Sequence, residues 1–373
     1  MTKLSVDQVP LRGKRVLLRA HLAVHLNADG NVANEHRVLS SISTIEYLLE
    51  NRARSVVLVS HIDRPHRRRV ERLSLKKVHP ILERCLGRFH PEEGRKGVNE
   101  AQIADFERSL RSHGDIYVND AFGTSHRDNV SLMGCGMELR CAGLLMKREL
   151  EYCAKAVESP ERSYVVIAGG AKASEKILHI SNVIDCVDDI VIIGGMATIF
   201  LKALCDMSIG DSLFDAERAK LVDGLVKKAE SKGVRIHLPI DLLIAEEKSA
   251  KSAPRVVSLD EAIPDGWMAL DIGPKSTEKF AEVIRKAKTI GWNGPAGCFE
   301  IDQFDKGTRG IAEAVVEATR NGALSIVGGG DTSTALKKFS LEDGVSHVST
   351  GGGTTLSLLG GYVLPGVEAL CSV

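Results

Sequence analysis

The sequence lacks several features that would place a protein in a large class at once. None of its eight cysteines belongs to a C-x-x-C pair, and no run reaches the roughly 18 apolar residues that span a bilayer. The first ten residues are polar, unlike an apolar leader, and residues 369–373 match no targeting tripeptide. These absences predict reduced thiols, no membrane segment and a cytoplasmic location.

Two common nucleotide-binding signatures are also missing. No G-x-x-x-x-G-K-[ST] occurs, which argues against a P-loop enzyme, and no G-x-G-x-x-G follows an apolar run, which argues against a dinucleotide dehydrogenase. Net charge is zero, but residues 1–150 carry 25 Lys and Arg against 18 Asp and Glu, and residues 151–373 carry 24 against 31. This modest excess does not suggest nucleic acid, and a basic first half fits a small anionic ligand better.

Short apolar runs alternate with segments of helical spacing along the whole chain. Such runs, separated by amphipathic helices, are typical of parallel sheets covered on both faces. The length suggests two domains, so we predict an α/β protein with two doubly wound parallel-sheet domains, although strand counting alone does not exclude a barrel. The expected strands are 15–20, 55–60, 115–121, 164–170, 190–195, 235–240, 289–294 and 324–330, and the expected helices include 42–52, 217–233 and 279–288.

Residues 144–158 are the expected boundary between the domains. The segment contains no Gly or Pro, so it can form one long helix that ends before Ser159 and Pro160. A helix that links two lobes makes domain closure a natural motion.

Five apolar runs in the second half end in glycine-rich turns. A strand that breaks into glycines before a helix presents backbone N–H groups at the helix N-terminus, which is an anion site. Several such turns in one domain predict a polyphosphate ligand. The runs are YVVIAGGAKASEKI (164–177), IVIIGGM (190–196), TIGWNGPAGCFE (289–300), LSIVGGGDTSTA (324–335) and HVSTGGG (347–353).

Lys172 and Lys176 lie four residues apart at the expected start of a helix, so they share one helical face and can point to the same anion. The alternative is that both are solvated surface lysines. Two cations in the opening turns of a helix oppose its dipole, however, and a bound anion would offset that cost. We therefore favour a phosphate-binding role for the pair.

Two acidic residues accompany the glycine turns. Asp331 follows Gly328–Gly330 and is a candidate Mg²⁺ ligand, because Mg²⁺ takes one or two carboxylates together with phosphate oxygens. Asp331 and Thr332 are also good N-cap residues, and the two roles are compatible. The Glu300 carboxylate can accept hydrogen bonds from ribose hydroxyls or form a surface ion pair.

Basic residues gather at strand ends in the first half. Each alone is more often structural, but together they would form a bidentate cage for phosphate and carboxylate groups. They are Arg37, His61, Arg64, Arg88 and Arg127.

In this order the motifs resemble the phosphoglycerate kinase family over nearly the whole chain. The resemblance is strong in GGAKASEKI, LFDAERAK, LPID, GWMALDIGPKS, WNGPAGCFE, GGGDTSTA and HVSTGGGTTLSLLGGYVLPGVEAL, and clear in TIEYLL, SHIDRP and YVNDAFGTSHR. It implies a monomeric, hinge-bending enzyme of glycolysis that transfers a phosphoryl group between 1,3-bisphosphoglycerate and MgADP, giving 3-phosphoglycerate and MgATP. Mg²⁺ and ATP or ADP are thus the implied cofactor and co-substrates, with no nucleic-acid or membrane partner.

The resemblance also assigns the two lobes. The first, residues 1–143, would bind the triose and would be joined by a tail from about residue 355 to 373. The second, residues 159–354, would bind the nucleotide.

Site roles follow from the same resemblance. Arg37, Lys172 and Lys176 would be catalytic, Asp331 would hold Mg²⁺, and the Gly351–Gly353 turn would donate N–H groups to the transferring group. The nucleotide site would comprise Gly170, Ala171, Lys172, Lys176, Gly194, Gly195, Asn293, Pro295, Cys298, Glu300, Gly328, Gly329, Gly330, Asp331, Thr332, Gly351 and Gly352. The triose would be bound by His21, Ala23, Arg37, His61, Arg64, Arg88 and Arg127, with Arg37 nearest the reacting phosphate.

Departures from the family pattern concentrate in the first half. The family's R-V-D-F-N-V-P segment reads RAHLAVH at residues 19–25, so His21 and Ala23 replace an aspartate and an asparagine. Between Arg64 and Arg88 the chain is shorter than the pattern by about 30 residues, roughly one strand and helix. Two alternatives therefore stay open, a non-catalytic nucleotide-binding relative with a regulatory or scaffold role, and a kinase of another small carboxylic acid. We favour the active kinase, because a binding protein has less need of both lysines together with Asp331.

Overall fold

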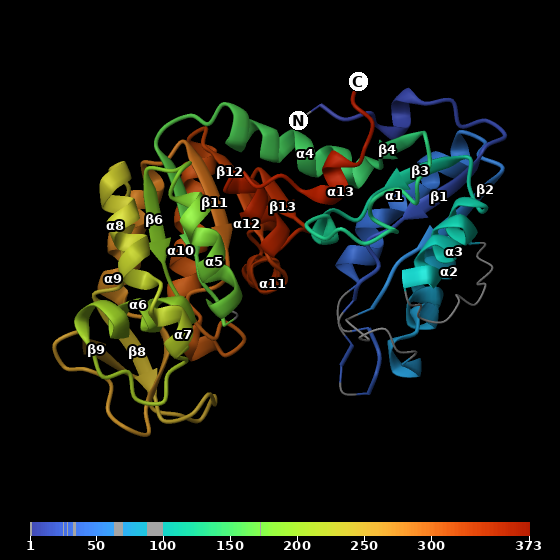
Figure 1. The fold of residues 1–373 in the computed structure, drawn as a ribbon. Coiled ribbons are helices and arrows are strands. Elements are labelled where there is room, and N and C mark those ends of the chain that lie inside the picture. The colour runs from blue at the N-terminus through green and yellow to red at the C-terminus, as the bar shows by residue number, and fades with distance from the viewer. Residues whose placement is uncertain are drawn as a thin grey trace. The chain divides into compact units, whose positions relative to one another are not determined.

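The structure is a computed structural model that describes residues 2–24, 26–27, 29–32, 35–62, 70–87, 100–171 and 173–373. The chain forms two compact units (Figure 1). The first unit comprises Met1–Glu151 and Val363–Val373, and the second comprises Tyr152–Tyr362.

The first unit is built on a parallel sheet of four strands in the order β2-β1-β3-β4. Apolar β1 is central and pairs with β2 on one side and β3 on the other. Its Val16 and Leu18 pack with Val38 and Leu48 of α1 in the core of this unit. The strands are β1 (Arg15–Arg19), β2 (Ser55–Val59), β3 (Ile116–Asn119) and β4 (Arg140–Ala142). The helices are η1 (Val6–Gln8), α1 (His36–Glu50), η2 (Glu71–Leu73), η3 (Leu75–Val78), α2 (His79–Leu86), α3 (Glu100–Arg111) and η4 (Phe122–Thr124).

The C-terminal residues belong to the first unit. Cys371 N–H donates to Arg140 O on β4 at 2.9 Å, and the Asn119 side chain donates to Gly366 O, within α13 (Pro365–Glu368), at 2.9 Å. We expected this tail to begin at about residue 355, but the unit takes up only Val363–Val373. Residues 355–362 belong to the second unit instead, because Leu356 and Leu359 of α12 (Gly353–Leu359) are part of that unit's core.

The segment 144–158 forms a single helix, α4 (Leu144–Glu158), across the boundary between the units. In its first half Lys147 makes an ion pair with Asp7 at 2.6 Å. In its second half the Tyr152 ring stacks on His347 of β13, with ring centroids 4.5 Å apart. Each half of this helix is thus anchored in its own unit.

The second unit contains a parallel sheet of six strands in the order β13-β12-β11-β5-β6-β7. From β5 the chain builds β6 and β7 to one side, then returns to place β11 against the other side of β5. The strand order therefore reverses between β5 and β11, and in doubly wound sheets ligands bind at the carboxyl ends of the strands beside this point. The strands are β5 (Tyr164–Ala168), β6 (Asp189–Ile192), β7 (Arg235–His237), β11 (Thr289–Asn293), β12 (Leu324–Gly328) and β13 (His347–Ser349).

Helices cover both faces of this sheet, which explains its nearly continuous apolar strands. Successive side chains of a strand point to opposite faces. Tyr164 and Val166 of β5 therefore belong to one core, and Val165 and Ile167 belong to the other. The helices are α5 (Ala173–Val183), α6 (Gly195–Cys205), α7 (Ala216–Ala219), α8 (Val222–Lys232), α9 (Pro274–Arg285), η5 (Asp302–Phe304), α10 (Lys306–Arg320), α11 (Gly330–Phe339) and η6 (Glu342–Gly344).

A small antiparallel sheet was not predicted from the sequence. It has the order β10-β8-β9 and comprises β8 (Asp241–Ala245), β9 (Arg255–Ser258) and β10 (Met268–Ile272). The expected strand 235–240 is shortened to β7, and the expected helix 217–233 is divided into α7 and α8. Runs of four or five apolar residues between polar turns do not reveal which strands they pair with, so only the fold shows this sheet.

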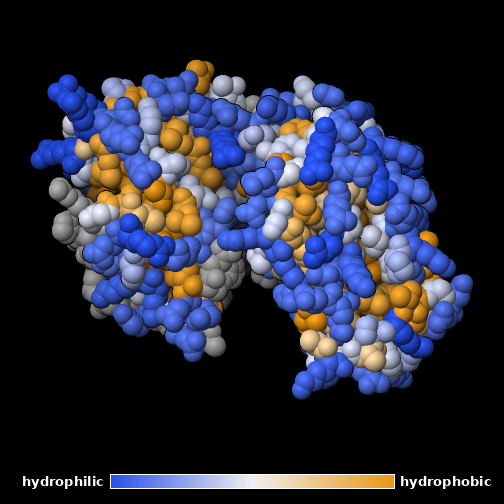
Figure 2. All heavy atoms as spheres, turned by 180° about the vertical axis from the view of Figure 1, so that it is seen from behind, coloured by the Kyte–Doolittle hydropathy of each residue, from blue (hydrophilic) through white to orange (hydrophobic). Residues whose placement is uncertain are grey.

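The surface is dominated by polar side chains. Figure 2 shows hydrophilic residues over most of the drawn face of each unit, with hydrophobic residues in smaller areas between them. Within the described ranges, no helix is long and apolar enough to cross a membrane.

Candidate nucleotide-binding site

Three glycine turns meet where the strand order reverses. Gly169 N–H donates to Asn293 O and Gly170 N–H donates to Pro295 O, both at 2.9 Å, which joins the turns after β5 and β11. The turn after β6 comes equally close, because a Cβ on Gly194 would lie 2.6 Å from the backbone nitrogen of Gly170. Only glycine permits this approach at a φ of +60°.

A pocket of about 120 Å³ opens beside these turns. The structure brings together eight of the residues that the sequence assigned to a nucleotide. They are Gly170, Ala171, Gly194, Gly195, Pro295, Cys298, Glu300 and Asp331.

The other residues that line the pocket were not predicted from the sequence. The pocket's other wall is largely apolar and includes Leu213, Leu242 of β8 and Leu270 of β10. An apolar wall that faces a few polar groups is typical of small-molecule sites. Here the apolar wall suits a flat base and the glycine turns suit phosphates. Leu213 lies in LFDAERAK and Leu270 in GWMALDIGPKS, so these two motifs were the available signal.

Lys176 occupies the point of strand reversal itself. It lies on α5, directly after β5, and its Nζ donates to Gly169 O at 2.6 Å and to Asn293 O at 3.3 Å. Its ammonium group therefore sits between the carboxyl ends of β5 and β11. Lys172 lies outside the described residues, so the structure does not place it.

Apart from Asp331, the residues of the turns after β12 and β13 do not line the pocket but are hydrogen-bonded to the turn after β11. Thr332 Oγ1 accepts a hydrogen bond from Gly294 N–H at 2.8 Å, and Asn293 Nδ2 donates to Gly352 O at 2.7 Å. These two contacts tie the turns after β11, β12 and β13 together. The predicted nucleotide residues that do not line the pocket, apart from the two lysines, are Asn293, Gly328, Gly329, Gly330, Thr332, Gly351 and Gly352.

The structure corrects one interpretation of Asp331. The N-cap of α11 is Gly329, at φ +100°, so neither Asp331 nor Thr332 caps this helix. Asp331 instead lies in the first turn, exposed and at the pocket.

Glu300 makes an ion pair, which was one of the two roles that the sequence allowed for it. Its carboxylate lies 3.5 Å from Lys248 Nζ, and both side chains are about half exposed, so the pair contributes at most about 1 kcal/mol. Lys248 also lines the pocket and was not predicted, because it follows β8 of the unforeseen antiparallel sheet. The pair thus forms part of the pocket's polar side.

The carboxylate donor set fits Mg²⁺ that arrives with a nucleotide. Across the part of the chain that the structure describes, no group of three His, Cys, Asp or Glu could hold a metal ion. Of the three carboxyl groups that line the pocket, Glu300 is paired with Lys248 and Asp271 is buried, whereas Asp331 is exposed in the first turn of α11. Mg²⁺ is usually bound by one or two carboxylates together with substrate phosphates, which Asp331 can satisfy.

Asp271 is a buried carboxylic acid at the pocket. It accepts hydrogen bonds from Gly307 N–H at 2.7 Å and from Ile272 N–H at 2.9 Å. Burial raises the pKa of Asp271 to about 8, and the neighbouring Asp305 carboxylate acts in the same direction. Asp271 is therefore largely protonated at neutral pH.

Replacing Asp271 with asparagine is expected to change how stability depends on pH. The folded protein holds a proton on Asp271 up to about pH 8, whereas the unfolded chain releases it near the ordinary pKa of 3.8. Stability must therefore fall as pH rises between these values, by up to about 1.4 kcal/mol per pH unit. Asparagine cannot titrate, so urea unfolding of Asp271→Asn between pH 5 and 8 should show a shallower decline. The exposed Asp260→Asn serves as the control, and equal slopes for Asp271→Asn and wild type would contradict the expectation.

The first unit gathers basic side chains at the ends of β1 and β2. Arg37 Nη1 donates to Ala23 O at 2.6 Å, and Arg19 Nη2 lies 2.6 Å from His61 Nδ1. Burial lowers the pKa of Arg19 to about 10, and the positive charge of Arg127 adds to this effect, so Arg127 belongs to the same neighbourhood.

His21 is enclosed by these cations. Its side chain is buried, and its Nδ1 has no hydrogen-bond partner within the described ranges. Burial lowers the pKa of His21 well below its usual range, and the charges of Arg37, Arg19, His61 and His36 lower it further. His21 is therefore neutral at pH 7. The structure thus brings His21, Ala23, Arg37, His61 and Arg127 into one unit, while Arg64 and Arg88 lie outside the described residues.

The fold and the pocket define an α/β protein with a doubly wound sheet, a class that binds ligands, often nucleotides, beside the reversal of strand order. The chain belongs to the phosphoglycerate kinase family, because the sequence model "Phosphoglycerate kinase" matches residues 6–88 and 87–362. It is 45% identical over 411 positions to the phosphoglycerate kinase of Schistosoma mansoni, with 99% of each chain covered. It is 43% identical to that of Gallus gallus over 413 positions, covering 100% of this chain and 99% of the other.

Solved structures show the same fold. The phosphoglycerate kinase from Coxiella burnetii superposes with a TM-score of 0.82 at 35% identity, and that from Pyrococcus horikoshii with 0.80 at 26% identity. In both cases 98% of each chain is covered.

The comparisons also bear on the shortened first half. The alignment with the Schistosoma mansoni protein spans 411 positions, more than the 373 residues of this chain, so the relative has residues that this chain lacks. The match to the family model is interrupted at residues 87–88. This interruption lies at the end of the interval 64–88 in which the sequence analysis expected the shortening.

Proposed function

We propose that the protein is an active phosphoglycerate kinase, a phosphotransferase with a carboxyl group as acceptor. It transfers a phosphoryl group reversibly between 1,3-bisphosphoglycerate and MgADP, giving 3-phosphoglycerate and MgATP in glycolysis. The observation that carries this proposal is 43–45% identity to phosphoglycerate kinases over almost the whole chain. The pocket beside Lys176 supports the proposal, because an apolar wall faces glycine turns of the kind that allow phosphates to approach the backbone.

In this proposal the second unit holds the nucleotide. The apolar wall at Leu213 and Leu270 takes the base, Glu300 the ribose and the glycine turns the phosphates. Asp331 holds Mg²⁺, which neutralises phosphate charge when bound. Lys172 and Lys176 stabilise the transferring phosphoryl group, and the Gly351–Gly353 turn donates N–H groups to it. Phosphoryl transfer depends mainly on such positioning and charge stabilisation.

The first unit would hold the triose. A neutral His21 at pH 7 leaves the positive charge of Arg19 and Arg37 uncompensated, whereas the family pattern places a carboxylate at this position. The site therefore remains suited to an anionic substrate despite the substitution. The proposed triose residues are His21, Ala23, Arg37, His61, Arg64, Arg88 and Arg127.

We further propose a monomer that closes by hinge bending and works in the cytoplasm. The continuous helix α4, which is anchored in both units, supports hinge bending. All eight cysteines lie in the described part of the chain and are free thiols, which supports a reducing compartment.

The test is a coupled assay of ATP formation from 1,3-bisphosphoglycerate and MgADP. We expect turnover of about ten per second or more, in the ordinary enzyme range. A Lys172→Ala, Asp331→Ala double variant should lose this turnover. Absence of turnover in the wild type with MgADP binding intact would contradict the proposal and favour a non-catalytic relative or a different acid substrate.

A further inference from the structure

One side of the nucleotide pocket is an irregular loop that needs external anchors. Residues 294–301, between β11 and η5, form neither helix nor strand, yet Pro295–Glu300 line the pocket. Thr308 Oγ1 on α10 accepts hydrogen bonds from Ala296 N–H and Gly297 N–H, both at 3.1 Å. The position of these pocket residues thus depends on groups that lie outside the loop.

Helix α11 holds the same loop at both ends. Near its N-terminus, Thr332 Oγ1 accepts from Gly294 N–H at 2.8 Å, where the loop begins. Near its C-terminus, Lys338 Nζ donates to Phe299 O at 2.7 Å, just before Glu300. Thr332 and Lys338 lie six residues apart, about 9 Å along the helix axis. The helix therefore holds the two ends of the loop at a fixed distance from each other.

The same helix carries a pocket residue of its own. Asp331 lies in the first turn of α11 and lines the pocket. Because Asp331 and Lys338 share one helix, fixing Phe299 to Lys338 also fixes the loop relative to Asp331. Lys338 itself does not line the pocket, so any effect on a ligand must pass through the backbone of the loop.

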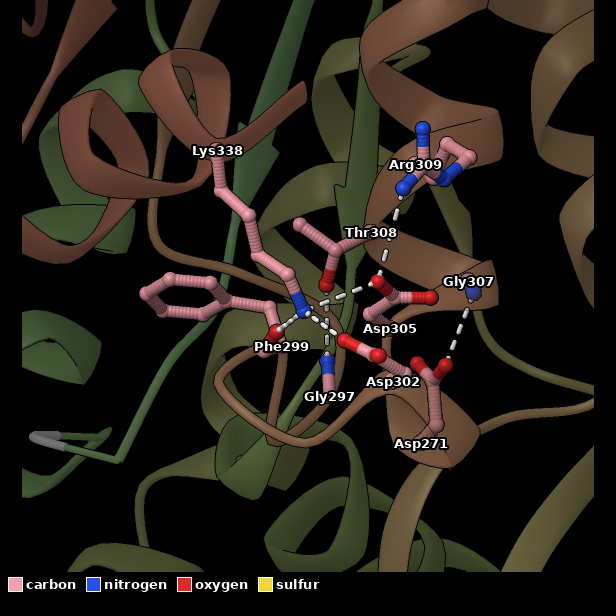
Figure 3. Close-up of polar contacts among 9 residues, drawn as sticks. All are labelled: Asp271, Gly297, Phe299, Asp302, Asp305, Gly307, Thr308, Arg309 and Lys338. Atoms are coloured by element: carbon pink, nitrogen blue, oxygen red, sulfur yellow. Dashed lines mark hydrogen bonds and ion pairs between the residues drawn. The ribbon is translucent and has the colours of Figure 1, made fainter.

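The environment of Lys338 keeps its ammonium group in place. Figure 3 shows Lys338 Nζ directed at the carbonyl of Phe299 and at the carboxylates of Asp302 and Asp305. The contact with Asp305, at 3.1 Å, is with a side chain that is only 6% exposed, whereas Asp302, at 2.6 Å, is 91% exposed. The exposed pair is screened by water and adds little, so the bonds to Asp305 and Phe299 dominate.

We propose that Lys338 is a positioning residue for nucleotide binding. Its hydrogen bond to Phe299 O fixes the Pro295–Glu300 loop to α11, the helix that carries Asp331. The inference rests on the proposed function in one respect, that this pocket binds MgADP. The inference predicts a selective effect: loss of the hydrogen bond between Lys338 and Phe299 weakens nucleotide binding and leaves triose binding unchanged.

The test compares Lys338→Met with Lys337→Met, which removes the exposed neighbouring lysine of the same helix. We expect the Kd for MgADP, measured by calorimetry, and the KM for MgADP to rise about five- to tenfold in Lys338→Met, as for loss of one charge-assisted hydrogen bond. The KM for 1,3-bisphosphoglycerate should stay within about twofold of the wild-type value. Lys338→Arg, which keeps a cationic donor, should recover most of the affinity, and Lys337→Met should behave as wild type.

Two results would overturn the inference. One is a lowered Tm in Lys338→Met with an unchanged Kd for MgADP, which would make Lys338 merely structural. The other is an equal rise in KM for both substrates. If Lys338→Met does not fold, Lys338→Gln is measured by the same criteria. Failure of the proposed function is separately visible, since the wild type itself would then form no ATP, whereas the Kd for MgADP still tests the role of Lys338 in nucleotide binding.

Discussion

Replacing Lys176 with methionine is expected to lower kcat by about two to three orders of magnitude, the usual cost of removing one preorganised charge-stabilising group. The ammonium group lies between the ends of β5 and β11, 2.6 Å from Gly169 O and 3.3 Å from Asn293 O. Methionine keeps the length of the side chain but removes the charge and the donor. The coupled assay gives kcat and both KM values, and thermal unfolding checks the fold.

The matched control is Lys228→Met on α8. Lys228 is also partly buried, and it also donates to a backbone carbonyl, Ser181 O, at 2.5 Å, but its contacts are with Ser181 and Asp185 and not with the turns after β5 and β11. Both variants should lose a comparable amount of stability, about 1 to 3 kcal/mol, because each loses a charged donor. Only Lys176→Met should lose turnover. A kcat within threefold of wild type would remove Lys176 from the mechanism.

Replacing Gly294 with alanine is expected to destabilise the protein by about 3 kcal/mol or more and to abolish MgADP binding. Gly294 has φ +107°, and a Cβ there would lie 2.0 Å from Gly169 O and 2.7 Å from Lys176 Nζ. Positive φ alone costs an L-residue about 1 to 3 kcal/mol, and the overlap with backbone forces the two turns apart. Urea unfolding and calorimetry with MgADP measure the two effects.

Gly224→Ala provides the opposite case. Gly224 lies inside α8, and a Cβ there would meet no atom within 4 Å. Alanine is favoured over glycine in a helix by about 1 kcal/mol, so this variant should gain stability and bind MgADP normally. If Gly294→Ala proved as stable as Gly224→Ala, the close approach of the turns after β5 and β11 would be refuted.

The sequence alone determined the fold class and the glycine-rich half of the candidate site. Nearly continuous apolar strands that end in glycines are a local signal, since burial on both faces and close backbone approach restrict each residue type where it stands. Gly170, Gly194 and Asp331 lie in the glycine-rich turns that the sequence predicted to hold a polyphosphate, the family resemblance added Pro295, and all four line one pocket. The order of motifs added the family, which full-length relatives confirm.

Only the tertiary structure decided which distant side chains complete the site. Leu242 and Leu270 reach the pocket from an antiparallel sheet whose pairing no local pattern encodes, and Lys248 reaches it from the loop that follows β8. Lys338 contacts a carbonyl 39 residues away in the sequence, and the neutral state of His21 depends on burial among cations from several segments. Desolvation and long-range hydrogen bonds arise from packing. The sequence around a residue therefore does not show whether that residue will be desolvated or will make such a bond.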